Sequence, residues 1–327
     1  MTNHGKRTVA VLIDAANDRI RPADLEVITL ARGLGGVAAV AGGELTPKAK
    51  DELARYGVTT LVEVESDVPF TITPAAAHGF AAGVRHVGAD LALTTTTFAN
   101  REIAALAAQE LGAGLVADAQ PQLDEAGNLL AFKRVFAGTW DIYSAFTTDV
   151  AVITVRANSI QAAPGDAANL NVVSLSVKAP ARAAAVTTTR RSVHPAGDAS
   201  RPTLSEAAYV VAGGRGTEGD FGPINTLADA LGAAVGATRD AVDEGWVDHD
   251  AQIGQTGVTV APLVYIGAGI SGAPHHRGGM QAAQTIVAVN VDAETPLFDI
   301  CDFAVVGDLA AVLPQAAQRI REYRAAK

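Results

Sequence analysis

Residues 207–214, AAYVVAGG, decide the fold, because they are typical of a short apolar strand that ends in glycines before a helix. The segment PINTLADALGAAVGATRDAVDEG at 223–245 is the predicted helix, and the alternation continues to the end of the chain. The later segments are strand PLVYIGAGI (262–270), helix APHHRGGMQAA (273–283), strand QTIVAVNVD (284–292), strand FAVVGD (303–308) and helix LAAVLPQAAQRIREYR (309–324). Polar clusters follow the strands, as at the carboxyl edge of a doubly wound sheet, where such folds bind ligands.

The first half has the same rhythm, which predicts a mostly parallel sheet covered by helices. Its expected strands are TVAVLID (8–14), GVAAVAGG (36–43), VTTLVEV (58–64), DLALTTTTF (90–98) and AGLVADA (113–119), and its expected helices are PADLEVITLARGLG (22–35), PKAKDELARYG (47–57) and NREIAALAAQELG (100–112). Residues 133–160 are typical of consecutive strands without helices, and we expect antiparallel strands attached to the parallel sheet.

The two halves predict two domains. Residues 162–203 mix proline, glycine and charge around one extended run, LNVVSLSVKAP at 170–180, and a boundary is expected near its end. The prediction is an α/β protein. A parallel βαβ sheet domain with added antiparallel strands at 1–195 precedes a doubly wound, Rossmann-like domain at 196–327.

Composition excludes several classes of function. Acidic residues outnumber basic ones 35 to 25, so nucleic acid and anionic membranes are disfavoured as partners. The single cysteine, Cys301, excludes an internal disulfide and a cysteine-ligated metal cluster. No apolar run is long enough for membrane insertion, and MTNHGKRTVAVLID contains no signal-peptide core, so we expect a cytoplasmic protein.

Two stretches match the pattern G-x-G-x-x-G, at Gly214–Gly219 and Gly267–Gly272. Such glycines let backbone N–H groups approach a phosphate at a helix N-terminus, yet a chain with 32 glycines also contains structural turns of this kind. Both interpretations stay open for both stretches. For Asp14, at the end of the first strand, a helix cap is favoured over a catalytic carboxylate.

The loop QIGQTGVTVAP at 252–262 carries amides, hydroxyls and glycines but no acid, base or thiol. Such groups bind the edge of a heteroaromatic ring, which suits a cofactor that supplies its own chemistry. Adjacent His275 and His276 cannot chelate one metal as i, i+4 neighbours would. One is expected to be exposed and the other to face the ligand crevice.

Several long motifs in order resemble the alpha subunit of electron transfer flavoprotein. They are RPTLSEAAYVVAGGRG, LADALGAAVGATRDAVDEG, QIGQTGVTVAP, YIGAGISGAPHHRGGM, TIVAVNVD and VVGDL, dense from Arg201 to Leu309, with a looser match in the first half. The resemblance implies a heterodimer with a beta subunit, which would contact the domain at 1–195, FAD held mainly by the carboxy-terminal domain of alpha, and AMP in beta. It also implies electrons received from acyl-CoA dehydrogenases of fatty acid β-oxidation, or similar flavoenzymes, and passed to a quinone oxidoreductase.

The resemblance also implies a set of FAD-binding residues. Arg215 would lie against the isoalloxazine ring, Thr256 would reach flavin N5, and His276 would donate to flavin O2. The remaining positions matched to the family's cofactor site are Thr238, Ile253, Gly254, Gln255, Ser271, Gly272, Ala273, Pro274, His275, Asn290, Asp308 and Leu309.

The chain departs from the family pattern where Pro274 and His275 replace an apolar residue and a glutamine, which leaves open whether His275 or His276 faces O2. Two alternative functions remain. One is a flavin-bifurcating member of the same family. The other is a NAD-dependent dehydrogenase on a Rossmann-like fold, which would need His249 or His276 as its acid or base.

Overall fold

A computed structural model describes residues 7–16, 19–136, 140–186 and 201–326. The chain divides into two compact units, one formed by Met1–Arg134 and Asp141–Arg191, the other by Val135–Trp140 and Ser192–Lys327. The predicted domain boundary at 195/196 lies outside the described residues.

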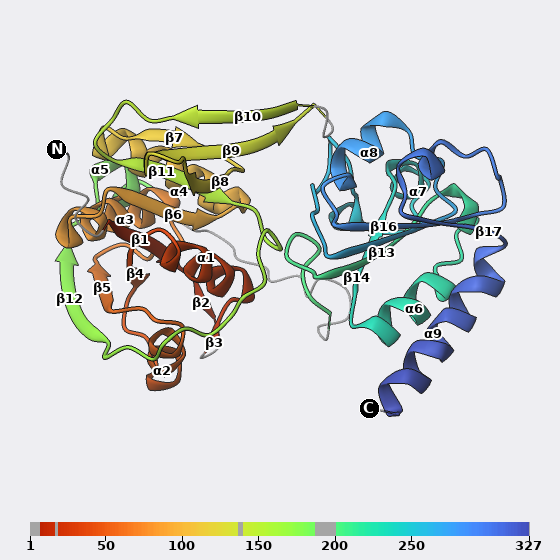
Figure 1. The fold of residues 1–327 in the computed structure, drawn as a ribbon, viewed down its shortest axis with the longest axis horizontal. Helices are drawn as coiled ribbons and strands as arrows, with labels where there is room; N and C mark the ends of the chain where they lie inside the picture. The colour runs from red at the N-terminus through yellow and green to blue at the C-terminus, as the bar shows by residue number, and fades with distance from the viewer. Residues whose placement is uncertain (1–6, 17–18, 137–139, 187–200, 327) are drawn as a thin grey trace. The chain divides into compact units, whose positions relative to one another are not determined.

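The first unit is built on a seven-stranded sheet in the order β12-β5-β4-β1-β6-β11-β7, and every neighbouring pair is parallel (Figure 1). Its strands are β1 (Thr8–Ile13), β4 (Gly36–Gly42), β5 (Thr60–Ser66), β6 (Leu91–Thr95), β7 (Gly114–Val116), β11 (Ala151–Val155) and β12 (Asn171–Val177). Its helices are α1 (Pro22–Arg32), α2 (Pro47–Arg55), α3 (Thr73–Val87), α4 (Phe98–Leu111) and α5 (Ala181–Ala184).

Both faces of this sheet are buried, because successive side chains of its central strands enter different cores. Val9 and Val11 of β1 pack with Ile28 of α1, while Ala10 and Leu12 belong to the cluster that contains Phe80 of α3. This explains why the central strands are continuous apolar runs without polar alternation.

Three further strands form their own sheet, in the order β10-β9-β8, which packs on the same core through Ala131. It consists of β8 (Gln120–Leu123), β9 (Leu129–Val135) and β10 (Trp140–Ala145), and β8 and β9 are antiparallel. The expectation of attached antiparallel strands over 133–160 was wrong for β11, which pairs parallel with β6 and β7. Periodicity distinguishes a strand from a helix but does not identify its sheet partner.

The segment between β1 and α1 also differs from expectation. A short antiparallel pair, β2 (Ala15–Ala16) and β3 (Arg19–Ile20), separates Asp14 from the helix. Asp14 is therefore not the helix cap: residue 21 is at that position without a side-chain cap, and Asp14 forms an ion pair with Arg21 at 2.9 Å.

The second unit contains a five-stranded parallel sheet in the order β14-β13-β15-β16-β17. Its strands are β13 (Tyr209–Gly213), β14 (Ala234–Ala237), β15 (Val264–Ala268), β16 (Thr285–Asn290) and β17 (Phe303–Val306). The helices are α6 (Gly222–Leu231), α7 (Arg239–Asp243), α8 (Pro274–Met280) and α9 (Leu309–Ala325), with 3-10 turns η1 (Arg215–Thr217), η2 (His249–Ala251) and η3 (Pro296–Ile300). In chain order the strands run 2-1-3-4-5, a doubly wound arrangement, and the predicted fold class is confirmed.

The predicted helix over 223–245 is interrupted. Gly232 adopts the left-handed conformation (φ 68°) that ends α6, and Ala234–Ala237 then form β14 beside β13. Alanine and valine at 233–235 are compatible with either structure, so pairing with β13 decides the outcome. In the part of the chain that the structure describes, no helix has both the length and the apolar character needed to cross a membrane.

Candidate functional site

The predicted site residues come from the carboxyl ends of the five strands of the second unit. The strand order reverses between β13 and β15, and doubly wound sheets bind ligands in the crevice outside such a point. Thr238 follows β14, Arg215 follows β13, and the segment from Ser271 to His276 follows β15. Asn290 ends β16, and Asp308 and Leu309 follow β17.

The two glycine stretches meet each other at this point. The amide N–H of Gly214 donates to the carbonyl of Ala268 at 3.2 Å, and that of Gly216 donates to Gly269 at 3.0 Å. A Cβ at Gly216 would lie 2.6 Å from the Cα of Gly269, so both positions require glycine for close packing. Because these amides are bonded within the protein, the Gly214–Gly219 stretch is a structural turn and not a phosphate loop.

The second glycine stretch, Gly267–Gly272, ends in backbone amides that form no hydrogen bond within the protein. Among the described residues, the N–H groups of 270, 271, 272 and 273 donate to no protein acceptor. Ile270 and Gly272 are buried, where an unpaired N–H is costly. Consecutive amides at the end of a strand are a donor set for oxygen-rich anionic groups such as a diphosphate.

The loop at 252–258 is anchored between β14 and α8. Ile253 donates its N–H to the carbonyl of Ala237 at 2.9 Å, and Gln255 donates its N–H to the carbonyl of His275 at 3.1 Å. Gln252 is buried, and its Nε2 donates to the hydroxyl oxygen of Thr256 at 2.9 Å. The Thr256 side chain is exposed, and its own proton remains available for another acceptor.

His276 is buried, with protein partners at both ring nitrogens. Nδ1 lies 3.1 Å from the carbonyl oxygen of Ile253, and Nε2 lies 2.7 Å from the hydroxyl of Tyr265. Because a carbonyl only accepts, Nδ1 carries the proton and Nε2 accepts from Tyr265. Burial lowers the pKa of His276 to about 4 and raises the pKa of Tyr265, so both side chains are neutral.

His275, by contrast, is exposed, and its Nδ1 lies 2.9 Å from Oε1 of Gln255. The expected donation from His276 to flavin O2 remains a prediction, since in this structure His276 faces the protein. The expectation that one histidine is exposed and the other faces the ligand crevice stays a prediction for the second histidine. Tyr265, whose buried hydroxyl binds the His276 ring, was not predicted from the sequence. A tyrosine inside a buried apolar strand is the signal that could have identified it.

Arg215 and Thr238 occupy the side of the site near α7. The Arg215 side chain is exposed and forms an ion pair with Asp240 at 3.1 Å, another partner that sequence reasoning missed. Thr238 caps α7, its hydroxyl accepting from the N–H of Ala241 at 3.5 Å. The cap gives Thr238 a structural role that is independent of any ligand.

The ends of β16 and β17 carry the remaining predicted residues, Asn290, Asp308 and Leu309. The amide of Asn290 donates to the carbonyl of Ile270 at 3.0 Å and so holds the start of the unbonded segment. Asp308 caps α9 through the N–H of Ala310 at 2.9 Å, and Leu309 is part of the core. The backbone joins these groups, because Gly307 donates to the carbonyl of Asn290 at 2.9 Å.

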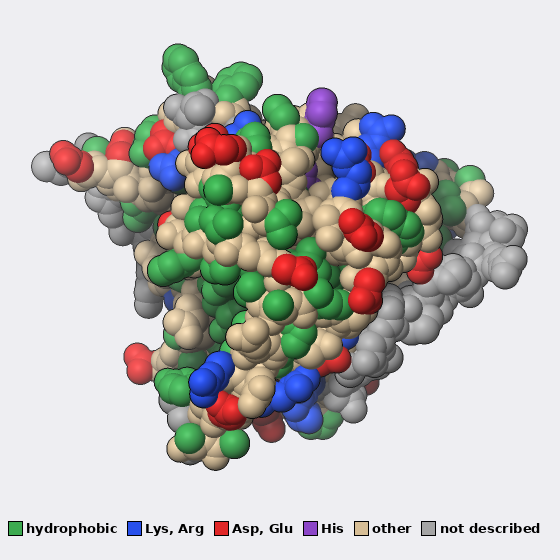
Figure 2. All heavy atoms as spheres, turned by 90° about the vertical axis from the view of Figure 1, so that its right-hand side faces the viewer, with side chains coloured by type: hydrophobic (Ala, Val, Ile, Leu, Met, Phe, Trp, Pro, Cys, Tyr) green, Lys and Arg blue, Asp and Glu red, His purple; other side chains and the backbone are tan. Residues whose placement is uncertain are grey.

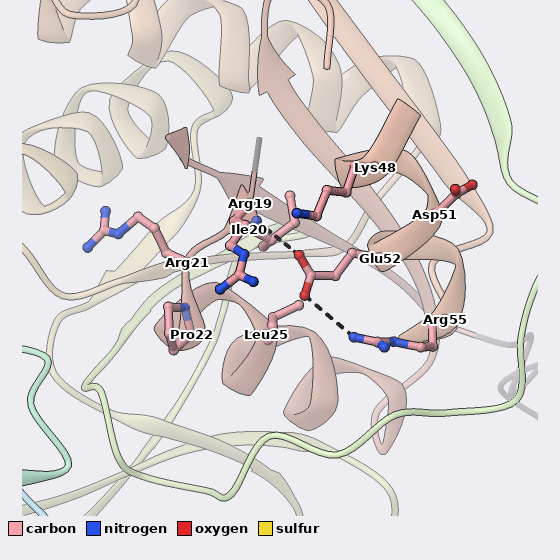
Figure 3. Close-up of a pocket in the computed structure, with 9 residues that line it drawn as sticks. All are labelled: Arg19, Ile20, Arg21, Pro22, Leu25, Lys48, Asp51, Glu52 and Arg55. Atoms are coloured by element: carbon pink, nitrogen blue, oxygen red, sulfur yellow. Dashed lines mark hydrogen bonds and ion pairs between the residues drawn. The ribbon is translucent and has the colours of Figure 1, made fainter. Parts of the chain in front are cut away.

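The first unit contains a separate cavity of about 660 Å³ (Figure 3). Arg19, Lys48 and Arg55 lie around Glu52, which accepts from the N–H of Ile20 at 3.2 Å. None of the predicted site residues lines it. Within the described residues, no group of three or more histidine, cysteine, aspartate or glutamate side chains could hold a metal ion.

Family models match both parts of the chain. One described as "Electron transfer flavoprotein FAD-binding domain" matches residues 203–281, and one described as "Electron transfer flavoprotein domain" matches residues 9–196. The first range contains the unbonded amides, the loop at 252–258 and both histidines.

Curated relatives match over nearly the full length. The electron transfer flavoprotein subunit alpha of Mycobacterium leprae is 41% identical over 95% of this chain and 97% of its own. The corresponding protein of Bacillus subtilis is 32% identical over 97% of this chain and 98% of its own. That of Paracoccus denitrificans is 49% identical over a shorter stretch, 38% of this chain and 41% of its own. With both domains matched and these identities, the chain belongs to the electron transfer flavoprotein alpha subunit family.

Proposed function

We propose that the chain is the alpha subunit of a heterodimeric electron transfer flavoprotein, with FAD bound at the carboxyl edge of its second sheet. The observation that carries the proposal is the run of unbonded amides at 270–273, inside the range matched by an FAD-binding domain. The diphosphate of FAD offers the oxygen acceptors that these amides lack, so the residues fit the cofactor.

The other predicted residues would act on the ring and adenosine ends of the cofactor. FAD supplies a ring system that accepts and releases electrons, and the chain supplies position and polarity. The Arg215 guanidinium adds positive charge beside the ring, and the Thr256 hydroxyl donates its free proton there. Charge-assisted donors near a ring that becomes more negative on reduction favour the reduced state. Asn290, Asp308 and Leu309 would hold the adenosine end.

The partner in this proposal is a beta subunit that holds AMP. β10 exposes Trp140 at 66%, Ile142 at 41% and Tyr143 at 57%, in the three-stranded sheet β10-β9-β8. Exposed aromatic and aliphatic side chains of this kind are enriched in the cores of protein interfaces. This sheet is the expected contact with the beta subunit.

Electrons would come from acyl-CoA dehydrogenases or related flavoenzymes and leave to a quinone oxidoreductase, with the complex located in the cytoplasm. The test is to purify the chain with its beta subunit and record visible absorption during stepwise anaerobic reduction. We expect a bound flavin that loses its absorption on reduction and passes electrons from an acyl-CoA dehydrogenase to a dye. A complex without flavin that also fails to take up added FAD would refute the proposal.

A further inference from the structure

The cavity of about 660 Å³ in the first unit gathers positive charge in an acidic chain. It lies between β3, the start of α1 and α2. Four cations and two carboxylates are among its lining residues: Arg19, Arg21, Lys48, Arg55, Asp51 and Glu52. The whole chain, by contrast, has 35 acidic and 25 basic residues. The cavity is therefore a place of local positive charge that attracts anions.

Two of the four cations are paired within the protein. Arg21 forms an ion pair with Asp14 at 2.9 Å, and Arg55 forms one with Glu52 at 3.5 Å. The second carboxylate oxygen of Glu52 accepts from the N–H of Ile20 at 3.2 Å. Glu52 therefore links β3 to α2 and is already occupied by groups of the chain itself.

The other two cations, Arg19 and Lys48, lack such partners. Among the described residues, neither side chain forms an ion pair or a hydrogen bond, and Figure 3 shows both beside Glu52. Lys50, in the same helix as Lys48, pairs with Glu63 at 2.9 Å. On the face drawn in Figure 2, lysine and arginine side chains are likewise interspersed with acidic ones. Two unpaired cations in one cavity repel each other, and an anion bound between them removes this cost.

The rest of the lining is apolar. Ile20 and Leu25 are buried, 3% and 7% exposed, and Pro22 adds an apolar ring at the start of α1. The N-terminus of this 11-residue helix carries partial positive charge at the same place. A cavity of this volume, with apolar walls and a few charged groups, is typical of sites for small organic ligands.

We propose that this cavity binds a small phosphorylated molecule. Its phosphate binds Arg19 and Lys48 near the start of α1, and its apolar or ring part covers Ile20 and Leu25. A phosphate monoester offers two negative charges and several acceptor oxygens, which match a guanidinium, an ammonium and a helix N-terminus. The cavity belongs to the first unit alone, so the inference does not rest on the proposed FAD site.

The test titrates the full chain with phenyl phosphate and with inorganic phosphate, by calorimetry at low salt. We expect phenyl phosphate to bind with a dissociation constant of about 1 mM or lower. It should bind roughly fivefold more tightly than inorganic phosphate, because its ring covers the apolar wall of the cavity. Added salt should weaken the binding, since the attraction is between charges that solvent reaches.

Variants that remove one charge each locate the phosphate. Arg19→Gln and Lys48→Gln should each weaken the binding of phenyl phosphate roughly fivefold or more. Arg182→Gln, on α5 of the same unit, removes an exposed arginine outside the cavity and should bind normally. Asp51→Asn removes a carboxylate of the lining and should tighten the binding. All four side chains are exposed, and circular dichroism verifies that each variant is folded.

Three results would overturn the inference. One is that phenyl phosphate shows no saturable binding. A second is equal affinity for phenyl phosphate and inorganic phosphate, which would identify an adventitious ion only. A third is binding that survives in the double variant of Arg19 and Lys48 but disappears when FAD is added, because the phosphate would then occupy the amides at 270–273.

The same experiments separate this inference from the proposed function. Competition with FAD would support the cofactor site while the cavity proposal falls. Conversely, binding that depends on Arg19 and Lys48, in a chain that takes up no FAD with its beta subunit, would leave the cavity proposal standing without the proposed function.

Discussion

The hydroxyl of Tyr265 donates to Nε2 of His276 at 2.7 Å, and both side chains are buried. The same imidazole donates from Nδ1 to the carbonyl of Ile253, which lies in the loop at 252–258. One neutral ring therefore connects a central strand, a helix and the predicted cofactor loop.

Removal of the Tyr265 hydroxyl should destabilise the chain. Tyr265→Phe leaves Nε2 of a buried imidazole without a donor, so we expect the free energy of unfolding to fall by about 1–3 kcal/mol. Urea denaturation measures the loss. Tyr209→Phe, at the half-buried first residue of β13, is the control and should change stability by less than about 0.5 kcal/mol. Equal losses in both variants would contradict the role assigned to this bond.

The depressed pKa of His276, about 4, predicts a dependence of stability on pH. In the unfolded chain the pKa is about 6.5, so between these values the folded chain binds fewer protons. The stabilising contribution is present above pH 6.5 and is lost as the pH falls toward 4. His276→Gln cannot titrate and should flatten this part of the stability curve, measured by urea denaturation at several pH values. A His276→Gln curve parallel to that of the unmodified chain would contradict the prediction.

The raised pKa of Asp24 predicts that stability changes with pH in the opposite direction, over almost the same pH range. It is buried, accepts from the N–H of Asp14 at 3.0 Å, and burial raises its pKa to about 7. The folded chain therefore binds more protons than the unfolded chain between about pH 4 and 7, and stability falls as the pH rises. Asp24→Asn should be more stable than the unmodified chain at pH 8, on the order of 2–4 kcal/mol, and similar at pH 4. Asp51→Asn, on an exposed helical position, serves as control.

Gly269 should not tolerate a side chain. Its φ is 63°, and an added Cβ would lie 2.8 Å from the Cα of Gly216 and 2.9 Å from Leu309. Gly269→Ala should cost about 2–4 kcal/mol of stability and weaken FAD binding, because it separates the two strand-end turns. Gly232→Ala has a similar φ with open space around it, and about 1 kcal/mol is expected. Thermal unfolding measures the loss of stability in both variants. Similar losses would show that the backbone conformation, and not the close packing at Gly269, sets the effect.

Arg215 should matter for the cofactor and hardly at all for folding. Its ion pair with Asp240 is exposed, and such pairs contribute little to stability. Arg215→Ala should lower FAD affinity at least tenfold, measured by fluorescence titration of the complex, with an unchanged midpoint of urea unfolding. Arg319→Ala removes another exposed, ion-paired arginine and should leave FAD affinity unaltered. Unchanged affinity in Arg215→Ala would show that this guanidinium does not contact the ring.

Much of the fold was predictable because apolar side chains recur with different periods in strands and in helices. The errors occurred where local sequence permits two structures. Ala234, Val235 and Ala237 are compatible with a helix or a strand, and β11 has the same apolar pattern in either strand direction. α3 (Thr73–Val87) was not predicted, although Pro74 lies in its first turn and Gly88, in the left-handed conformation, ends it.

The site was predictable at the level of position and less so at the level of contacts. Most of the proposed residues lie at or just beyond the carboxyl end of a strand of one sheet, and those of the loop at 252–258 follow the turn η2. Which nitrogen of His276 meets which partner depends on Tyr265 and Ile253, 11 and 23 residues away along the chain. No local pattern encodes such a pairing.

If FAD binds the four amides at 270–273 as proposed, folding of this chain is coupled to the cofactor. A ligand that binds only the folded chain stabilises it in proportion to the logarithm of the ligand's free concentration. Resistance to proteolysis, and hence cellular abundance, should therefore follow the supply of the cofactor as well as the rate of synthesis.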